Sequence, residues 1–434
     1  MLATLGSIAA LLLGAFIMLL GNSLLTLALP LKMSDAGFAT EITGVIMAAY
    51  FAGLLTGAFY GKRVIGEVGH IRAFAGFAAM MAAATLAYPM QISEVAWCAL
   101  RFIGGFCVAG LFAALESWMN ERSTNELRGR VLSVYMVNNY MGIMLGQLMI
   151  NLWDVDTLEV FMMSALLTSL CLVPIVLTKV RAPDIAVIRP LSLVALYRSS
   201  PLGVAGSMGS GTVLGAYYGM GAIFAQQIGL SVFQISLFMG SFILGGMALQ
   251  WPVGRISDRY DRRLVLLGIL SVVLVACAAA FGASFLREPF HLLLGIGVLL
   301  GGAMMSIYPI AVSQVYDHVV PDRYVAASSG LLLAYSLGAI AGPIIVGFAM
   351  AQLGPFAFFI FIAAVAGLLA AFGLYRVRSR EPLPADERKA FVALPRMSPV
   401  ASELDPRLAP SAARDPLSDS SDATVAATPA RQPD

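Results

Sequence analysis

The chain has 434 residues, of which 59% are hydrophobic and only 12% are charged, about half the charged share of a typical soluble domain. A net charge of +2 is too small to indicate a nucleic-acid-binding protein. The four cysteines all fall in apolar stretches, so the sequence predicts no disulfide framework, no metal site and no other cofactor. This composition indicates an all-α polytopic membrane protein.

Apolar runs of about 20 residues are long enough to cross the roughly 30 Å hydrocarbon layer as helices. The first run is too long for the core of a signal peptide, so we interpret it as an uncleaved first span. The sequence predicts twelve transmembrane helices in chain order, at 5–31, 42–62, 71–90, 95–118, 129–151, 158–178, 203–226, 232–254, 262–284, 289–315, 325–351 and 354–376.

The basic residues of the links fall almost entirely on one side of this arrangement. Fifteen Lys and Arg residues lie in links on that side, and only Lys32 and Arg287 lie on the other. Because basic links stay in the cytoplasm, we expect both termini to be cytoplasmic.

The longest internal link divides the chain into two halves. Residues 179–202 hold four basic residues and three prolines, which predicts a cytoplasmic linker between a six-helix bundle at 1–178 and a second at 203–376. Residues 377–434 contain nine of the 21 prolines and almost no aromatic residues. Such a composition cannot form a core of its own, so we expect a disordered cytoplasmic tail.

Glycines recur in equivalent spans of the two halves. Small residues four apart let helix backbones approach closely in lipid. Their matched placement predicts a duplicated, pseudo-symmetric bundle, an architecture typical of secondary transporters, although glycines that serve packing alone are an alternative interpretation. The fourth and tenth spans carry Gly104 with Gly105 and Gly301 with Gly302, and the fifth and eleventh carry Gly142 with Gly146 and Gly338 with Gly342.

A dense group of charges lies at 254–263, between two long uncharged stretches. Its spacing of Gly254, Asp258, Arg259, Arg262 and Arg263 resembles the loop motif of the major facilitator superfamily of secondary transporters, except that Asp261 stands where that family has glycine. In the first half only Gly69 and Arg72 fit the motif, and Gly66 stands where its acid belongs. The resemblance implies the major facilitator fold of twelve helices and a charge latch on the cytoplasmic face. The latch candidates are Gly69, Arg72, Glu116, Arg128, Arg130, Gly254, Asp258, Arg259, Arg262 and Arg263.

Further short patterns resemble the poorly characterised bacterial YcaD-type branch of that superfamily. They are Glu116-Ser117, Arg128-Gly129-Arg130, Gly146-Gln147 and the stretch 250–254. The resemblance covers residues 1–376 and implies the inner membrane of a bacterium. Gln147 stands where drug/proton antiporters have proline, which disfavours that class. None of these patterns indicates a substrate.

Arg101 is the only basic residue well inside a predicted span, about 9 Å below the outer end of the fourth helix. Burying an arginine there costs about 2.5–3.5 kcal/mol, so its side chain needs a partner or a water-filled cavity. It could bind helix-end carbonyls or extend outward. Alternatively it could contact an anionic or polar substrate group or assist proton coupling.

Other polar side chains lie at a similar depth. The resemblance implies that the first, fourth, seventh and tenth helices line a central cavity, although each polar residue could instead make a helix–helix hydrogen bond. Glu116 could pair with Arg72 or Arg130, or carry a proton. The cavity candidates are Asn22, Arg101, Asn139, Tyr217, Tyr308 and Tyr335, with Tyr218 beside them.

The leading hypothesis is a secondary transporter that moves a small solute by alternating access between the two bundles. A transporter-like sensor or scaffold that binds a solute without net transport is the alternative. Gly57, Gly61 and Lys62 do not have P-loop spacing, no zinc-protease motif occurs, and an enzyme is not expected. The expected partners are a small-molecule substrate and the lipid bilayer, with protons or another ion as candidates for coupling. We do not expect the protein to bind nucleic acid, and we expect it to be a monomer.

Overall fold

The computed structural model describes residues 2–123, 127–154, 157–177, 191–320 and 323–379, together with Pro384, 388–393, Arg396, 399–405 and Arg407. Helices make up nearly all of these ranges, and no strand occurs within them. This confirms the all-α class.

The first half is built from α1 (Leu2–Asp35), α2 (Thr40–Val68), α3 (His70–Ala87), α4 (Glu94–Arg122), α5 (Arg128–Leu148), α6 (Glu159–Leu170) and α7 (Leu172–Val176). The short 3-10 turns η1 (Tyr88–Met90) and η2 (Met149–Leu152) extend α3 and α5. Because α7 follows α6 after the single residue Cys171, the two together correspond to one predicted span.

The second half begins with the short α8 (Leu193–Ser199). It continues with α9 (Pro201–Gln227), α10 (Val232–Arg259), α11 (Arg262–Gly282), η3 (Ala283–Phe285), α12 (Phe290–Tyr316), α13 (Tyr324–Leu353) and α14 (Ala357–Ser379). A last 3-10 turn, η6, covers Pro399–Leu404.

Each predicted span coincides with one of these helices or, for the sixth, with the α6–α7 pair. Ten helical segments of the described chain are long and apolar enough to cross a membrane by length and composition. The other two predicted spans, α5 and α9, are less apolar than these ten. The α5 helix carries arginine, asparagine and glutamine, and α9 carries seven glycines. Both lie inside the bundles, α5 against α1 and α9 against α13.

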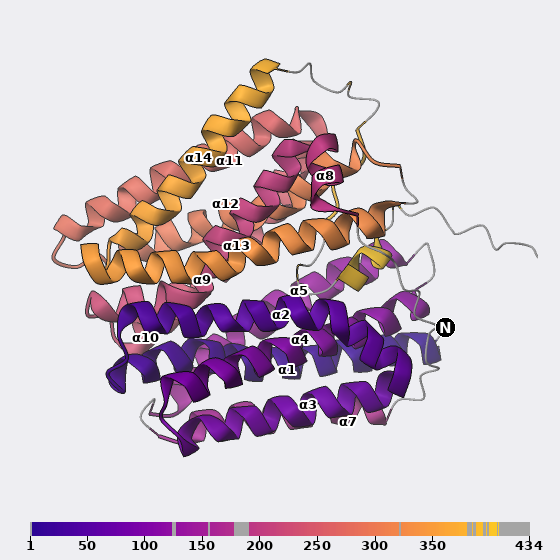
Figure 1. Ribbon diagram of the computed structural model, residues 1–434, viewed down its shortest axis with the longest axis vertical. Coiled ribbons are helices and arrows are strands. Elements are labelled where there is room, and N and C mark those ends of the chain that lie inside the picture. The colour runs from indigo at the N-terminus through magenta and orange to yellow at the C-terminus, as the bar shows by residue number, and fades with distance from the viewer. Residues whose placement is uncertain are drawn as a thin grey trace, which may run out of the picture.

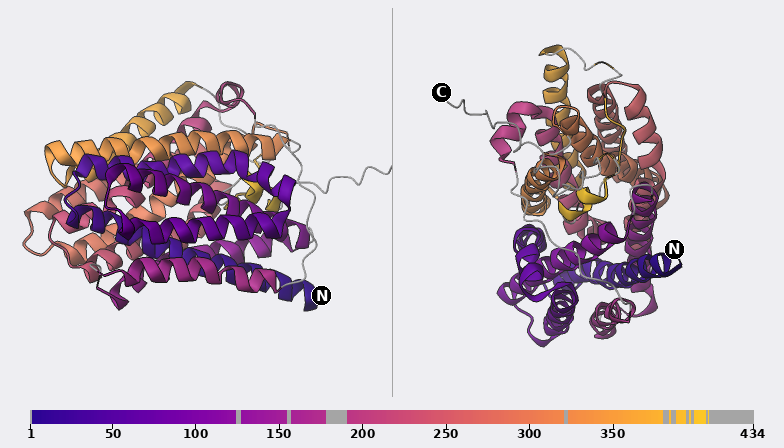
Figure 2. Two further views of the ribbon diagram at one scale, coloured as in Figure 1. Left: turned by 60° about the horizontal axis from the view of Figure 1, so that its bottom comes forward. Right: turned by 90° about the vertical axis from the view of Figure 1, so that its right-hand side faces the viewer.

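The helices form two bundles that lie side by side with their axes roughly parallel (Figure 1). One bundle holds α1 to α7 and the other α9 to α14, with α10 packing on α5 across the boundary. We call the end of the molecule that carries the α2–α3 and α10–α11 links the basic end. The amino terminus lies at this end, and so does η6, which Figure 2 shows between the two bundles.

Glycines make the same close contacts in both halves. A Cβ on Gly105 of α4 would lie 2.0 Å from the Tyr50 carbonyl oxygen of α2, and one on Gly301 of α12 would lie 1.8 Å from the Phe242 carbonyl oxygen of α10. These distances are far below van der Waals contact, so only glycine permits the two backbones to approach this closely. By contrast, a Cβ on Gly104 would meet nothing within 4 Å.

The same repetition holds for the fifth and eleventh spans. A Cβ on Gly146 would lie 2.5 Å from the Leu20 carbonyl oxygen, and one on Gly342 would lie 2.2 Å from the Thr212 carbonyl oxygen. Equivalent helix pairs therefore pack in equivalent ways, as expected for a duplicated bundle.

The two bundles touch directly at the end opposite the basic end. A Cβ on Gly44 of α2 would lie 2.4 Å from the Pro343 carbonyl oxygen of α13. Gln227 Nε2 donates a hydrogen bond to Thr40 Oγ1 at 3.0 Å, and Gln226 Nε2 donates one to Asp35 Oδ1 at 3.3 Å. These contacts close the gap between the bundles at that end.

At the basic end, part of the chain's last segment lies between the bundles. We call 388–393, Arg396, 399–405 and Arg407 the C-terminal segment. Its Val400 and Leu404 are buried, so this part of the tail expected to be disordered packs on the bundles. Most of the remaining tail, including 408–434, lies outside the described residues. The segment has too few apolar residues for a core of its own, but they pack on surfaces that the two bundles already provide.

Candidate functional site

A cavity lies between the two bundles near the middle of the molecule. Helices of both halves line it, and the space left within it has a volume of about 90 Å³. Its polar lining includes Asn22, Arg101, Tyr140, Tyr218, Tyr335 and Arg396. We call it the central cavity.

Arg101 is held in the central cavity by the first half alone. Its guanidinium lies 4.4 Å from the centre of the Tyr50 ring, and Nη2 donates a hydrogen bond to Thr26 Oγ1 at 3.3 Å. The residue is only 2% exposed, and its Nε has no hydrogen-bond partner. No Asp or Glu occurs among the described residues that line the cavity. A buried cation with an unused donor is thus available to an anionic or polar group.

Asn22 also lines the cavity, where its Nδ2 donates a hydrogen bond to the Tyr50 hydroxyl at 3.3 Å. Tyr50 therefore contacts both Asn22 and Arg101. Tyr50 was not predicted from the sequence, because its position on the second helix gave no reason to prefer it over other tyrosines.

Of the two adjacent tyrosines on α9, the structure places Tyr218 and not Tyr217 in the cavity. Tyr217 is fully buried inside the C-terminal bundle, stacks on Phe242 with ring centroids 3.7 Å apart, and donates a hydrogen bond to the Phe238 carbonyl oxygen at 3.3 Å. Successive helical residues point about 100° apart, so only one of the pair can face the cavity. Choosing between them requires the packing of the whole bundle.

Tyr335 of α13 lines the cavity, and Tyr308 of α12 packs against it with ring centroids 5.3 Å apart. The guanidinium of Arg396, from the C-terminal segment, lies 6.0 Å from the centre of the Tyr335 ring. Arg396 was not among the predicted site residues, because the composition of residues 377–434 predicted a disordered tail.

Asn139 lies in a different place from the other candidates. It is buried in α5 close to Tyr135, whose hydroxyl donates a hydrogen bond to Glu116 Oε1 at 2.9 Å. It is not among the described residues that line the central cavity. Glu116, at 0% exposure, accordingly belongs to a buried group within the first half.

One missed contact joins the two bundles beside the cavity. The Tyr140 hydroxyl of α5 donates a hydrogen bond to Gln250 Oε1 of α10 at 2.7 Å. Gln250 begins the stretch 250–254, which resembles the YcaD-type branch. The sequence identified this stretch, but it gave no indication that Gln250 bonds to Tyr140.

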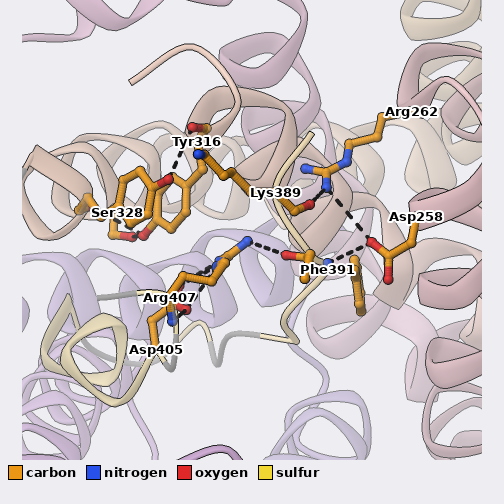
Figure 3. Close-up of polar contacts among 10 residues, drawn as sticks. Asp258, Arg262, Tyr316, Ser328, Lys389, Phe391, Asp405 and Arg407 are labelled. Carbon is orange, nitrogen blue, oxygen red and sulfur yellow. Dashed lines mark hydrogen bonds and ion pairs between the residues drawn. The ribbon is translucent and has the colours of Figure 1, made fainter. Parts of the chain in front are cut away.

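Two of the second-half latch residues, Asp258 and Arg262, lie together at the basic end (Figure 3). Arg262 is 1% exposed and its Nη1 lies 3.1 Å from Asp317 Oδ2 at the end of α12, while Asp258 Oδ1 lies 3.9 Å from its Nη2. Asp258 accepts a hydrogen bond from the backbone N–H of Phe391 at 2.7 Å. Arg259 is exposed. In this conformation Asp258 and Arg262 contact the backbone of the C-terminal segment, and Arg262 also pairs with Asp317 of its own bundle.

Asp261, which departs from the family pattern, has a local role. Its Oδ1 accepts a hydrogen bond from the Arg263 backbone N–H at 3.0 Å, so it caps the amino terminus of α11. Its Oδ2 also lies 2.7 Å from Arg263 Nη2. This substitution therefore supports the start of α11 and fixes Arg263.

The first-half latch candidates are more dispersed. Gly69 joins α2 to α3 with φ of 86°, a left-handed conformation that favours glycine. Arg72 and Arg130 are exposed, whereas Arg128 lies near Glu403 of the C-terminal segment.

Burial raises the pKa of two carboxyl groups at the basic end. For Asp317 the nearby Arg262 guanidinium opposes this rise. For Glu403 the opposing groups are Lys62 from α2, Arg128 from α5 and a hydrogen bond from Asn120 of α4. Both carboxyl groups are thus buried at junctions with the C-terminal segment.

Comparison with known proteins identifies the family. The sequence profile of the Major Facilitator Superfamily matches residues 11–286 and 202–419, which together span most of the chain. The chain belongs to the Major Facilitator Superfamily. It is an integral membrane protein of a transporter family, which confirms the resemblance and the fold that it implied.

The relatives of this superfamily member agree with the finer resemblance. An uncharacterized MFS-type transporter of Enterobacter sp. (strain 638) is 28% identical over 379 residues, 86% of this chain and 96% of the relative. The MFS-type transporter YcaD of Escherichia fergusonii is 28% identical over 354 residues, 81% of this chain and 91% of YcaD.

Solved structures of the superfamily share the fold. The nucleoside transporter NupG has a TM-score of 0.70 at 13% identity, covering 85% of this chain and 98% of its own. A bacterial homologue of the human lysosomal transporter Spinster, in an inward-facing and occupied conformation, has a TM-score of 0.65 at 15% identity, covering 88% of this chain and 97% of its own.

Proposed function

We propose that this protein is a secondary transporter that moves a small polar or anionic solute through the central cavity by alternating access. The observation that carries the proposal is the cavity itself, because residues of both bundles line it and close contacts between the bundles shut one of its ends. A site between two inverted or duplicated units is where rocking exposes a solute to alternate sides.

The arrangement also supports an orientation. The basic end faces the cytoplasm of a bacterial cell, since it carries most of the lysines and arginines of the links. Both termini then lie in the cytoplasm, and the direct contacts of Thr40 with Gln227 and of Gly44 with Pro343 close the outer side. The outer side of the cavity is therefore closed in this conformation. With the C-terminal segment removed from the basic end, the cavity would face the cytoplasm.

Arg101 is the residue that we assign to solute binding, with Asn22 and the cavity tyrosines as further contacts. The unused donor of its buried guanidinium suits a carboxylate or another anionic oxygen. Glu116 is the candidate for proton coupling, because it is a buried carboxyl group in the first half.

A thermal-shift screen of the purified protein against sugars, amino acids, organic acids and drugs tests the proposal first. A solute that binds only the folded form raises the melting temperature. The same solute, radiolabelled, is then offered to proteoliposomes. The proposal requires flux, and binding without flux would contradict it.

A sensor or scaffold is the second candidate, and one observation favours it. Arg396 of the C-terminal segment lines the cavity and η6 packs on both bundles at the basic end, an arrangement that suits a protein that binds a ligand without passing it. Flux in proteoliposomes separates the two, because a sensor gives a thermal shift and no transport.

A further inference from the structure

The C-terminal segment is fixed to the second bundle by its backbone. The N–H of Lys389 donates a hydrogen bond to Asp317 Oδ1 at 2.9 Å, and its carbonyl oxygen accepts one from Arg262. The N–H of Phe391 donates to Asp258 Oδ1 at 2.7 Å. Figure 3 shows the segment running past these side chains. Charged groups of the loop motif therefore hold the segment in a defined register.

A glycine of the motif makes room for the segment. A Cβ on Gly254 would lie 2.4 Å from Cδ1 of Phe391, so the Phe391 ring packs directly on the α10 backbone. Phe391 and the next two residues of the segment also line a gap between α5 and α10, beside Trp251. Any larger residue at 254 would compete with this ring for space.

The segment reaches the first bundle as well. Glu403 Oε1 lies 3.9 Å from Lys62 Nζ of α2, and Asn120 Nδ2 of α4 donates a hydrogen bond to Glu403 Oε2 at 3.3 Å. The Leu404 side chain is fully buried. Since η6 packs on α4 and on α13, it bridges the two bundles at the basic end.

Two arginines of the segment complete the contact. Arg407 pairs with Asp405, and its guanidinium lies 4.7 Å from the centre of the Tyr316 ring. Arg396 enters the central cavity, where it lies near Tyr335 and where its Nη1 is buried without a partner. The segment thus occupies both the mouth and part of the binding space.

We propose that the C-terminal segment is an intramolecular plug that closes the cytoplasmic mouth of the central cavity and competes with the solute for it. This inference rests on the proposed function for its meaning, because a plug regulates transport only if the protein transports. The remaining volume of about 90 Å³ is well below the roughly 300 Å³ of small ligand sites, so a solute of ordinary size enters only after the segment leaves.

The test measures access to the cavity and needs no solute. In the full-length chain with its four cysteines replaced by alanine, Ser336→Cys places one thiol on the cavity wall. The purified protein is treated with the charged thiol reagent MTSET, and the labelling rate is compared with and without Phe391→Asp. Ala390→Asp, an exposed neighbour in the same segment, is the matched control.

Phe391→Asp should make labelling about tenfold faster, because the lost burial of this ring is worth roughly one decade in the docking equilibrium. Ala390→Asp should leave the rate unchanged. Gly254→Leu should also accelerate labelling, because it displaces the Phe391 ring while the sequence of the C-terminal segment stays unchanged. If Phe391→Asp fails to fold, the Gly254→Leu variant provides the test. Equal labelling rates in the parent and in a folded Phe391→Asp or Gly254→Leu variant would overturn the plug.

The outcome is independent of the transport assay. Faster labelling with no flux for any solute would keep the plug and reject the transporter. Flux in the parent together with unchanged labelling would keep the transporter and reject the plug.

Discussion

The ion pair between Arg262 and Asp317 gives the sharpest stability prediction. Their side chains are 1% and 3% exposed, and their nearest charged atoms are 3.1 Å apart. Removing one member of a buried pair leaves an uncompensated charge, which costs about 3–5 kcal/mol. We therefore expect Asp317→Asn or Arg262→Gln to lower the free energy of unfolding by about that amount.

The chain supplies a matched control. Arg63 and Glu67 form a pair at the same distance of 3.1 Å, but their side chains are 77% and 65% exposed. Exposed pairs contribute about 0–1 kcal/mol, so Arg63→Gln should have little effect. Unfolding of each variant in detergent, followed by tryptophan fluorescence in urea, compares the two pairs directly.

A double variant separates the pair from its members. Arg262→Gln together with Asp317→Asn removes both charges, so it should cost less than the sum of the two single substitutions, with a coupling of about 1–3 kcal/mol. Additive single effects, or an Arg262→Gln variant that costs no more than Arg63→Gln, would show that the buried pair is not coupled in this way.

Three further predictions concern packing, protonation and binding. Gly105→Val should abolish folded expression by forcing α2 from α4, since a Cβ there lies 2.0 Å from a carbonyl oxygen, whereas Gly104→Val should express normally by size-exclusion chromatography. Burial raises the pKa of Glu403 above its ordinary 4.5, so docking of the C-terminal segment is strongest below that pH and weakens as pH rises through the raised value. MTSET labelling of the cavity thiol, measured relative to the Phe391→Asp variant, should therefore speed up from pH 4.5 to 7.5. Glu403→Gln should reduce that change, and Asp317, whose pKa is also raised by burial and which binds Lys389, accounts for the rest. Arg101→Ala should lose the thermal shift given by the stabilising solute but keep its elution profile, and an undiminished shift would exclude Arg101 from the site.

The helices were predictable because each apolar run is long enough for the bilayer and is bounded by charged or glycine-containing links. The break between α6 and α7 at Cys171 was not predicted, although Pro174 marks it. Proline has no N–H to bond the carbonyl oxygen of Leu170, so the helix is interrupted just before it. The sequence aligned the pair Gly104 and Gly105 with the pair Gly301 and Gly302, whereas in the structure Gly105 is the counterpart of Gly301. Their backbone contacts explain why, since both meet a carbonyl oxygen on the second helix of their own half.

The candidate site was predicted only in part. Arg101 stood out because a buried cation in an apolar span is costly and needs a partner. Tyr217 was chosen where Tyr218 faces the cavity, because depth along a helix does not give the direction of a side chain. Arg396 was missed since composition describes whether a segment can fold alone and not whether it can pack on a preformed surface.

The latch residues illustrate a further limit of sequence. Asp258 and Arg262 matched the family motif by spacing, which placed them at the end of α10 and the start of α11. Their partners could not be predicted. Asp317 lies more than 50 residues away, and the backbone of Lys389 and Phe391 belongs to a segment with no motif of its own.

Transport by alternating access is tested most directly by fixing the outer end shut. In a chain with its four native cysteines replaced, Thr40→Cys and Gln227→Cys are joined by a short bismaleimide, because their native side chains are 3.0 Å apart in this conformation. Proteoliposome flux is measured with the radiolabelled solute that gives the largest thermal shift. We predict flux through the unlinked double variant and none after cross-linking. Equal flux before and after cross-linking would contradict alternating access through the central cavity.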